Sequence, residues 1–296
     1  MNRQQEQDRL LRGTALQNRV RVFAALSTSL VGELHRRHET TPTAAAALGR
    51  TVTAAAMMGF MLKGDEKLTV QVKGGGPIGQ IVADANANGE ARAYVSNPSV
   101  DLPLNDKGKL DVAGAVGTDG ALYIVKDLGM KEPYRGTSPI VSGELAEDFT
   151  YYFGVSEQTP SAVALGVLVD VDYSIKAAGG FIIQLLPGLR DEEITEIEQK
   201  LAQLPSVTSL INQGMGPEEI VRHLFDDVRI MDTIPLTFRC SCSQERVENT
   251  LVSLGKAELA SILRDNGRAE VACHFCNENY QVERVDLERL IQDIDG

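Results

Sequence analysis

All four cysteines of this chain of 296 residues lie within 37 residues near its C-terminus. They form two short-spaced pairs, Cys240-Ser241-Cys242 and Cys273-His274-Phe275-Cys276, with thirty residues between them. Two such pairs can converge on one ion as a tetrahedral four-sulfur site, the geometry that zinc favours in structural sites. Thiolates are also oxidisable, so the same four atoms can bind a metal or form disulfides. The spacing therefore predicts a metal site with redox capacity.

The segment that carries these cysteines is short. Periodic apolar residues after Cys242 predict two helices, Asn266-Gly267 predicts a turn, strands are expected on both sides of the second pair, and Asp286 to Ile291 is expected to form a closing helix. A module of about 60 residues has a thin apolar core and commonly needs a metal or disulfides. A structural zinc site supplies about 10–16 kcal/mol at neutral pH, so the metal is expected to decide whether this module folds.

Several roles for the thiols remain open from the residues alone. A zinc site that only holds the fold is one, but Cys-x-Cys can close as a small strained disulfide ring, which favours redox use. His274 lies inside the second pair, yet four cysteines complete a tetrahedron, so we expect its side chain to face solvent. A thioredoxin-like pair needs a helix after it, whereas a strand follows Cys276. Arg239, Arg246 and Arg268 are candidates to offset the thiolate charge.

The rest of the chain predicts an α+β fold. Apolar residues between Leu10 and Leu34 recur at roughly helical spacing, and an alanine-rich run follows Thr41-Pro42, so the first 63 residues are expected to be helical. Alternating segments with glycine- and proline-marked turns then predict a mainly antiparallel sheet. The expected strands are 68–72, 78–83, 91–95, 121–125, 162–171 and 180–186, with a helix at 143–152.

After Pro187-Gly188, two amphipathic helices are expected. One runs from Asp191 to Leu204 with an apolar stripe, and the other starts at Pro217. The stripe is Ile194, Ile197, Leu201 and Leu204, and the second apolar cluster is Ile220, Val221, Leu224 and Phe225. Such faces cannot be buried alone, so we expect them to pack on the sheet domain. The predicted organisation is an α+β core at 1–187, a helical linker at 188–234 and a four-cysteine module at 235–296.

Charge and motifs limit the function. The net charge is −12, with about −5 in each of residues 189–239 and 240–296, which disfavours nucleic-acid binding because phosphates would be repelled. No apolar run is long enough to span a bilayer and residues 1–8 are polar, so we expect a cytoplasmic protein without membrane contact. Gly74 to Gly79 matches a dinucleotide motif, but a strand follows it where a helix is needed, so we expect a hairpin turn. No catalytic constellation is evident, and we expect no enzyme.

The cysteine pattern at the end of a chain of 32.1 kDa closely resembles the redox-regulated 33 kDa heat-shock chaperone family. The resemblance covers nearly the whole chain, and the cysteines are its most specific part. Other similar segments are 68–71 before the Gly-Pro turn, 156–158 before Pro160, 177–180 and 238–246. One departure is Gly75, where the family resemblance would predict an acidic residue.

The resemblance implies an ATP-independent holdase. It implies one zinc ion per reduced, inactive chain, bound by Cys240, Cys242, Cys273 and Cys276. Oxidation would then release zinc and form Cys240–Cys242 and Cys273–Cys276 disulfides, after which the module and linker unfold, homodimers form and unfolding client proteins are bound. Two alternatives stay open: a zinc-ribbon module that binds nucleic acid or ribosomes, and a thiol–disulfide oxidoreductase.

Overall fold

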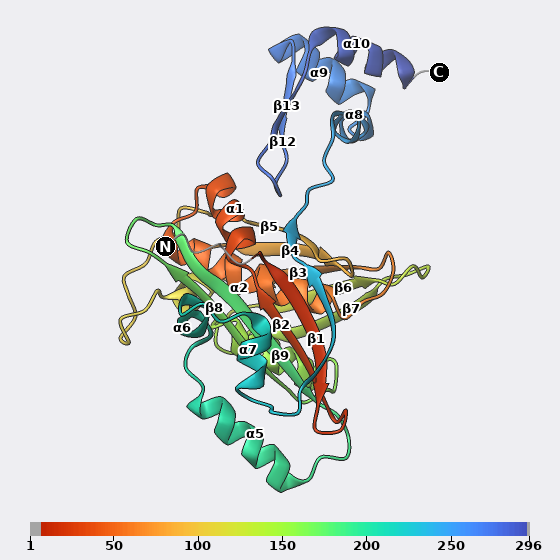
Figure 1. The fold of residues 1–296 in the computed structure, drawn as a ribbon. Coiled ribbons are helices and arrows are strands. Elements are labelled where there is room, and N and C mark those ends of the chain that lie inside the picture. The colour runs from red at the N-terminus through yellow and green to blue at the C-terminus, as the bar shows by residue number, and fades with distance from the viewer. Residues whose placement is uncertain (1–6, 295–296) are drawn as a thin grey trace. The chain divides into compact units, whose positions relative to one another are not determined.

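The computed structural model describes residues 7–294, and the chain divides into two compact units, the first ending at Arg239 and the second beginning at Cys240. Both are α+β, and their sheets are antiparallel apart from one short parallel pair, so the predicted fold class is confirmed (Figure 1). The first unit contains β1 (Arg9–Ala15), β2 (Val20–Leu26), α1 (Thr28–His38), α2 (Pro42–Gly59), β3 (Lys67–Lys73), β4 (Gln80–Asn86), β5 (Glu90–Val95), α3 (Val112–Val116), β6 (Ala121–Asp127), β7 (Tyr134–Pro139), α4 (Ala146–Val155), β8 (Ser161–Val169), β9 (Ile175–Leu185), α5 (Asp191–Gln203), α6 (Val207–Asn212), α7 (Pro217–Arg222), β10 (Arg229–Pro235) and β11 (Thr237–Phe238).

The N-terminal segment corrects the sequence prediction. Residues 9–26 form the antiparallel hairpin β1–β2 and not a helix, whereas α1 and α2 are helices as expected. β2 is buried along almost its whole length, so its apolar residues run almost continuously, and with Leu10 and Leu11 of β1 they mimic a helical pattern. The turn between the strands contains no glycine that would have indicated it. Its positive φ angles, which usually favour glycine, are adopted by Leu16, Gln17 and Asn18. Residues 1–6 of the predicted helix lie outside the described residues.

Helix α2 joins the two sheets of the first unit. The five-stranded sheet has the order β10-β1-β2-β9-β8, and the six-stranded sheet has the order β11-β5-β4-β3-β6-β7. One cluster of buried residues contains the alanine-rich face of α2 together with side chains from both sheets, such as Phe23, Val70 and Ile182. Almost every residue of α2 is buried, so the helix must be covered on nearly all sides. The alanines keep it narrow enough to lie between two sheets.

The six-stranded sheet contains most of the predicted strands. β3, β4, β5 and β6 form at the expected positions, while the short edge strand β7 was not predicted. The glycine-rich segment is the turn between the antiparallel strands β3 and β4, which confirms the hairpin and excludes the dinucleotide motif. Gly75 has a φ of 75°, and a Cβ there would lie 2.9 Å from the carbonyl oxygen of Asp119. Glycine is therefore favoured at the position where the family resemblance predicts an acid.

The second unit has the elements that the sequence predicts. It contains α8 (Gln244–Ser253), α9 (Lys256–Asn266), β12 (Ala269–Ala272), β13 (Asn279–Val282) and α10 (Arg284–Asp293). Gly267 ends α9 in the left-handed conformation, and β12 and β13 form a hairpin. Only seven apolar residues are in its buried cluster, which includes Leu259, Val282 and Leu287. Within residues 7–294, no helix has the length and apolar character needed to cross a membrane.

Candidate metal centre

The first thiol pair lies between a strand and a helix N-terminus. Cys240 follows Arg239, whose backbone N–H donates to the carbonyl oxygen of Ala91 on β5. Ser243 caps α8, since its hydroxyl accepts from the backbone N–H of Arg246 at 3.3 Å. The Arg246 guanidinium also donates to the Ser241 hydroxyl at 2.6 Å, so it lies beside the Cys-x-Cys segment.

The second thiol pair lies in the turn between β12 and β13. The backbone N–H of Cys273 donates to the carbonyl oxygen of Glu278 at 2.9 Å. The backbone N–H of Asn277 donates to the carbonyl oxygen of Cys273 at 2.8 Å. Asn277 has a φ of 60°, a conformation that asparagine tolerates better than most residues. This closed turn directs Cys273 and Cys276 to the same side, while His274 between them is exposed, as predicted.

The two pairs meet, although thirty residues separate them. All four Sγ atoms lie within 4.8 Å of one another. Cys240 Sγ is 3.7 Å from Cys273 Sγ, and Cys242 Sγ is 3.2 Å from Cys276 Sγ. A tetrahedral ion with metal–sulfur bonds of about 2.3 Å needs sulfur–sulfur separations of about 3.8 Å. The four thiols therefore have the donor set and the spacing to hold such an ion.

The pKa values of the thiols also indicate a site that needs a cation to keep its sulfurs ionised. Burial raises the pKa of Cys276, and hydrogen bonds among the thiols raise it further. Burial also raises the pKa of Cys242, although a hydrogen bond from Tyr280 opposes the change. Four thiolates at this spacing would repel one another, and a divalent cation would reverse the preference for the neutral thiols. Of the three candidate arginines, Arg246 bonds within the Cys-x-Cys segment, while Arg239 and Arg268 form ion pairs with Glu90 and Glu270.

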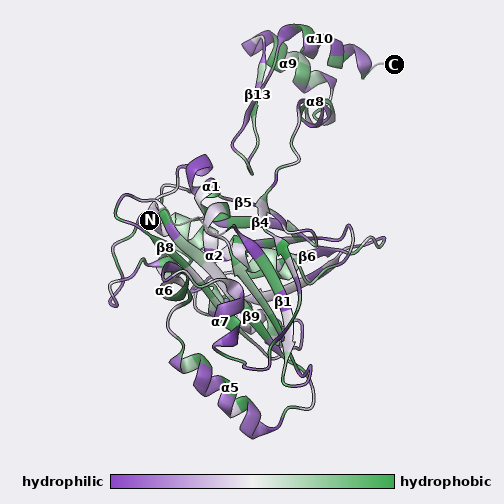
Figure 2. Cartoon of the chain, in the orientation of Figure 1, coloured by the Kyte–Doolittle hydropathy of each residue, from purple (hydrophilic) through white to green (hydrophobic). Residues whose placement is uncertain are grey.

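The linker forms three helices and not the two predicted, and α6, which was not predicted, packs with α7 on one face of the five-stranded sheet. A second buried cluster joins them to the sheet residues Leu11, Val22 and Phe181. The linker residues in it are Ile197, Val207, Leu210, Ile220, Val221, Leu224, Phe225 and Val228. α5 contributes only Ile197 as a buried residue; Leu201 and, just after the helix, Leu204 are partly buried, and Ile194 is half-buried. Figure 2 shows that hydrophilic and hydrophobic residues alternate along α5.

Two polar contacts tie the linker to the β1–β2 turn. The Arg19 guanidinium donates to both carboxylate oxygens of Glu193 at 2.7 and 2.8 Å and to the carbonyl oxygen of Gly188 at 3.1 Å. At the other end of the linker helices, Asp227 accepts from the backbone N–H of Leu16 at 2.9 Å. The linker also continues into β10, which pairs with β1. The β1–β2 hairpin therefore contacts the linker on either side of its helices.

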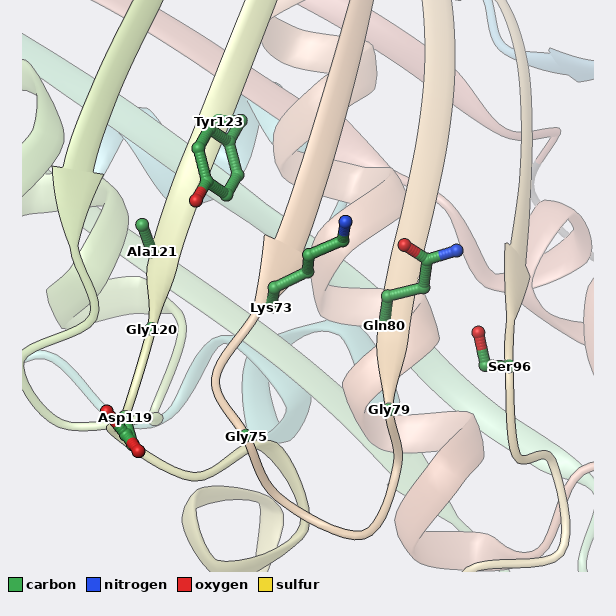
Figure 3. A pocket seen from close by; sticks show the side chains of 9 residues that line it. All are labelled: Lys73, Gly75, Gly79, Gln80, Ser96, Asp119, Gly120, Ala121 and Tyr123. Atoms are coloured by element: carbon green, nitrogen blue, oxygen red, sulfur yellow. The ribbon is translucent and has the colours of Figure 1, made fainter.

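A shallow hollow near the glycine-rich turn is unrelated to the thiols. Its lining includes Lys73, Gln80, Ser96, Asp119 and Tyr123, at or near the ends of β3, β4, β5 and β6 (Figure 3). The residues that line it include neither cysteine nor histidine. We therefore place the candidate functional site at the four thiols and not at this hollow.

Comparisons with known proteins lead to the family that the cysteine pattern resembles. The family model described as Hsp33 protein matches residues 8–283. The chain belongs to the Hsp33 family. The 33 kDa chaperonins of Bacillus subtilis and Brevibacillus brevis are 55% and 54% identical to it, over 96% and 97% of this chain and 98% and 99% of theirs. A crystal structure of the 33 kDa chaperonin from Thermotoga maritima, a heat shock protein 33 homolog, has a TM-score of 0.92 at 38% identity, and the match covers 98% of this chain and 100% of that one.

Sequence reasoning missed two features of this Hsp33 family member. The Tyr280 hydroxyl donates to Cys242 Sγ at 3.0 Å, a contact that only the folded hairpin brings about. The Arg19–Glu193 pair joins residues that are 174 positions apart, and no local pattern signals it. Alternating apolar residues in β10, such as Ile230 and Ile234, could have indicated that the linker ends in a strand.

Proposed function

We propose that this protein is a redox-regulated, ATP-independent chaperone of the cytoplasm. In the reduced state it binds one zinc ion through Cys240, Cys242, Cys273 and Cys276 and is inactive. After oxidation it forms homodimers and binds unfolding proteins, which prevents their aggregation under oxidative and heat stress. We expect no nucleic-acid binding, since both the linker and the four-cysteine module carry an acidic excess.

The convergence of the four thiols carries this proposal. Sγ atoms within 4.8 Å of one another, in a unit with seven buried apolar residues, support a fold that depends on the bound ion. When bound, zinc supplies the positive charge that lets four neighbouring sulfurs remain ionised. The thiols are therefore both the structural support of the module and its oxidisable groups.

We propose that oxidation joins sequence neighbours, Cys240 with Cys242 and Cys273 with Cys276. Each pair of thiols gives up two electrons and two protons to one hydrogen peroxide, which leaves as two water molecules. In the folded module each thiol lies beside a thiol of the other pair, Cys240 beside Cys273 and Cys242 beside Cys276. Once the module loosens, the two pairs can move apart. Sequence neighbours stay close, because short loops cost the least entropy to close. Peptide mapping that finds mainly Cys242–Cys273 linkage contradicts this pairing.

The linker connects thiol chemistry to client binding. We propose that the loss of zinc unfolds the module and that the linker then detaches from the five-stranded sheet, helped by repulsion among its acidic residues. Detachment exposes the linker cluster around Ile220 and Val221 together with the sheet residues Leu11, Val22 and Phe181. An apolar surface of this kind is what a dimer partner or an unfolding client binds.

Light scattering of an aggregating client protein tests the proposal. The reduced, zinc-loaded chain should leave aggregation unchanged, and the chain treated with peroxide at raised temperature should suppress it without ATP. His274→Ala is the matched control, because this exposed residue lies in the same turn and should keep the switch intact. Equal suppression by reduced and oxidised protein would exclude redox regulation. Disulfide reduction of insulin by the protein would favour an oxidoreductase instead.

A further inference from the structure

Tyr280 connects the two thiol pairs. It lies on β13, directly after the turn that carries Cys273 and Cys276, and its ring is partly buried against the apolar cluster of the module. Its hydroxyl donates to Sγ of Cys242 at 3.0 Å, and Cys242 belongs to the other pair. A hairpin that holds one pair therefore also holds a hydrogen-bond donor on a sulfur of the other.

The position of this hydroxyl is determined by backbone pairing. Tyr280 lies opposite Val271 in the β12–β13 register, and the turn is closed by the bond from Cys273 to Glu278. The donor is a phenol, which cannot itself bind the ion in place of a thiolate at neutral pH without losing its proton. Its contact with Cys242 therefore adds a partner to a sulfur without competing for the site.

We propose that Tyr280 is a positioning residue that strengthens metal binding at Cys242 and slows the oxidation of this sulfur. The inference rests on the proposed zinc-binding function of the four thiols. A hydrogen bond to a thiolate stabilises the charged sulfur and draws electron density away from it. Partners of this kind, one shell outside the ligands, orient them, and their loss typically lowers metal affinity by about 10- to 100-fold.

The same hydrogen bond opposes the first step of oxidation. The Cys242 thiolate attacks one oxygen of hydrogen peroxide, the O–O bond breaks, and the products are a sulfenic acid and hydroxide. The Cys240 thiolate then attacks the Cys242 sulfur, which forms the disulfide and releases a second hydroxide. Sulfur is oxidised by two electrons in total, and peroxide is reduced by the same two. A lone pair engaged by the Tyr280 hydroxyl is a weaker nucleophile in the first step.

Tyr280→Phe in the full-length chain tests this role, because it removes the hydroxyl and keeps the ring. Cobalt(II) in place of zinc reports on the sulfur directly through its sulfur-to-metal charge-transfer band. We expect this band to move to longer wavelength in the variant, zinc affinity measured by chelator competition to fall about tenfold, and zinc release by peroxide to become several-fold faster. Ser261→Ala is the matched control, since it removes a hydroxyl of the module that bonds to Asp265 and not to sulfur.

A second measurement strengthens the donor instead of removing it. Replacing all tyrosines by 3-fluorotyrosine makes each hydroxyl a stronger donor, and Tyr280 is the only tyrosine among residues 240–296. The cobalt band of the fluorinated wild-type chain should move to shorter wavelength and its zinc release should slow, with neither change in the fluorinated Tyr280→Phe chain. An unchanged band and release rate in both experiments would overturn the role of Tyr280. A wild-type chain that binds neither metal would instead overturn the proposed zinc site.

Discussion

The two units of this chain differ in what holds them together. In the first unit, α2 and two sheets share a cluster of buried apolar residues, and the buried carboxylate of Asp148 accepts hydrogen bonds from three backbone N–H groups. The second unit buries seven apolar residues around Leu259 and Leu287 and places four thiols at one point. On the proposed function, thiol chemistry should therefore unfold the second unit while the first stays folded.

The largest expected effect comes from removing two of the thiols. Cys273→Ser with Cys276→Ser should abolish zinc binding and remove on the order of 10 kcal/mol of metal-derived stabilisation from the module. Elemental analysis should fall from about one zinc per chain, as expected for one four-sulfur site, to none. Hydrogen exchange should become fast throughout residues 240–294 and stay slow in α2. His274→Ala should retain zinc and protection. Full zinc content in the double variant would contradict the assignment of the ligands.

The second prediction tests whether detachment of the linker from the five-stranded sheet is enough to activate client binding. Phe225 follows α7 and is 3% exposed in the cluster beneath the linker. Phe225→Ala should weaken this packing by about 3–5 kcal/mol. We expect fast hydrogen exchange in residues 189–228 and suppression of client aggregation without oxidant. Met231→Ala is the control, because this linker side chain is 67% exposed. If the linker detaches in this variant but the protein suppresses aggregation only after oxidation, detachment alone does not create the client-binding surface.

The contrast between the units also explains what could be predicted from the sequence. The convergence of the four thiols was predictable because Cys240 to Cys276 encode it locally, through two short spacings and a hairpin. The β1–β2 hairpin was not, because β2 is apolar along almost its whole length and shows no alternation, and the turn uses Leu16, Gln17 and Asn18 without a glycine. The packing of α7 on the sheet followed from its apolar cluster, whereas α6 was not predicted and the α5 stripe is largely half-buried. The contacts of Arg19 and Tyr280 depend on tertiary structure that no local pattern encodes.

A third prediction concerns a buried charge in the first unit. Asp8 is 3% exposed, and its carboxylate accepts from the backbone N–H groups of Ser29 and Leu30 at 3.0 and 2.7 Å, which caps α1 from another element. Burial outweighs these bonds and raises the pKa of Asp8 to about 6. Because the folded-state pKa lies above the usual 3.8, this group favours folding below about pH 3.8, and the contribution is lost as the pH rises through about 6.

Asp8→Asn should therefore flatten the pH dependence of the first unit. Relative to wild type, the variant should gain about 2 kcal/mol between pH 4 and pH 7, because each pKa unit corresponds to about 1.4 kcal/mol and Asp8 is already partly ionised in the unfolded chain at pH 4. Chemical denaturation followed at several pH values measures this difference. Asp65→Asn, at an exposed position, is the control. A constant difference between Asp8→Asn and wild type across this range would show that Asp8 does not titrate there.

The smallest expected effect lies at the start of the linker, where α5 has the least buried surface. Arg19 holds the pKa of Glu193 down to about 2, mainly through its hydrogen bonds to the carboxylate. Since the folded-state pKa is lowered from 4.5, the pair stabilises the docked linker above about pH 4.5, and this contribution is lost as the pH falls towards 2.

Arg19→Gln should speed hydrogen exchange in α5 at neutral pH and leave α7 protected, because Val221 and Phe225 still anchor α7. Arg222→Ala, which breaks a pair internal to α7, should not affect α5. If α5 and α7 instead lose protection together, the linker detaches as one cooperative unit, and the β1–β2 turn helps to hold all of it.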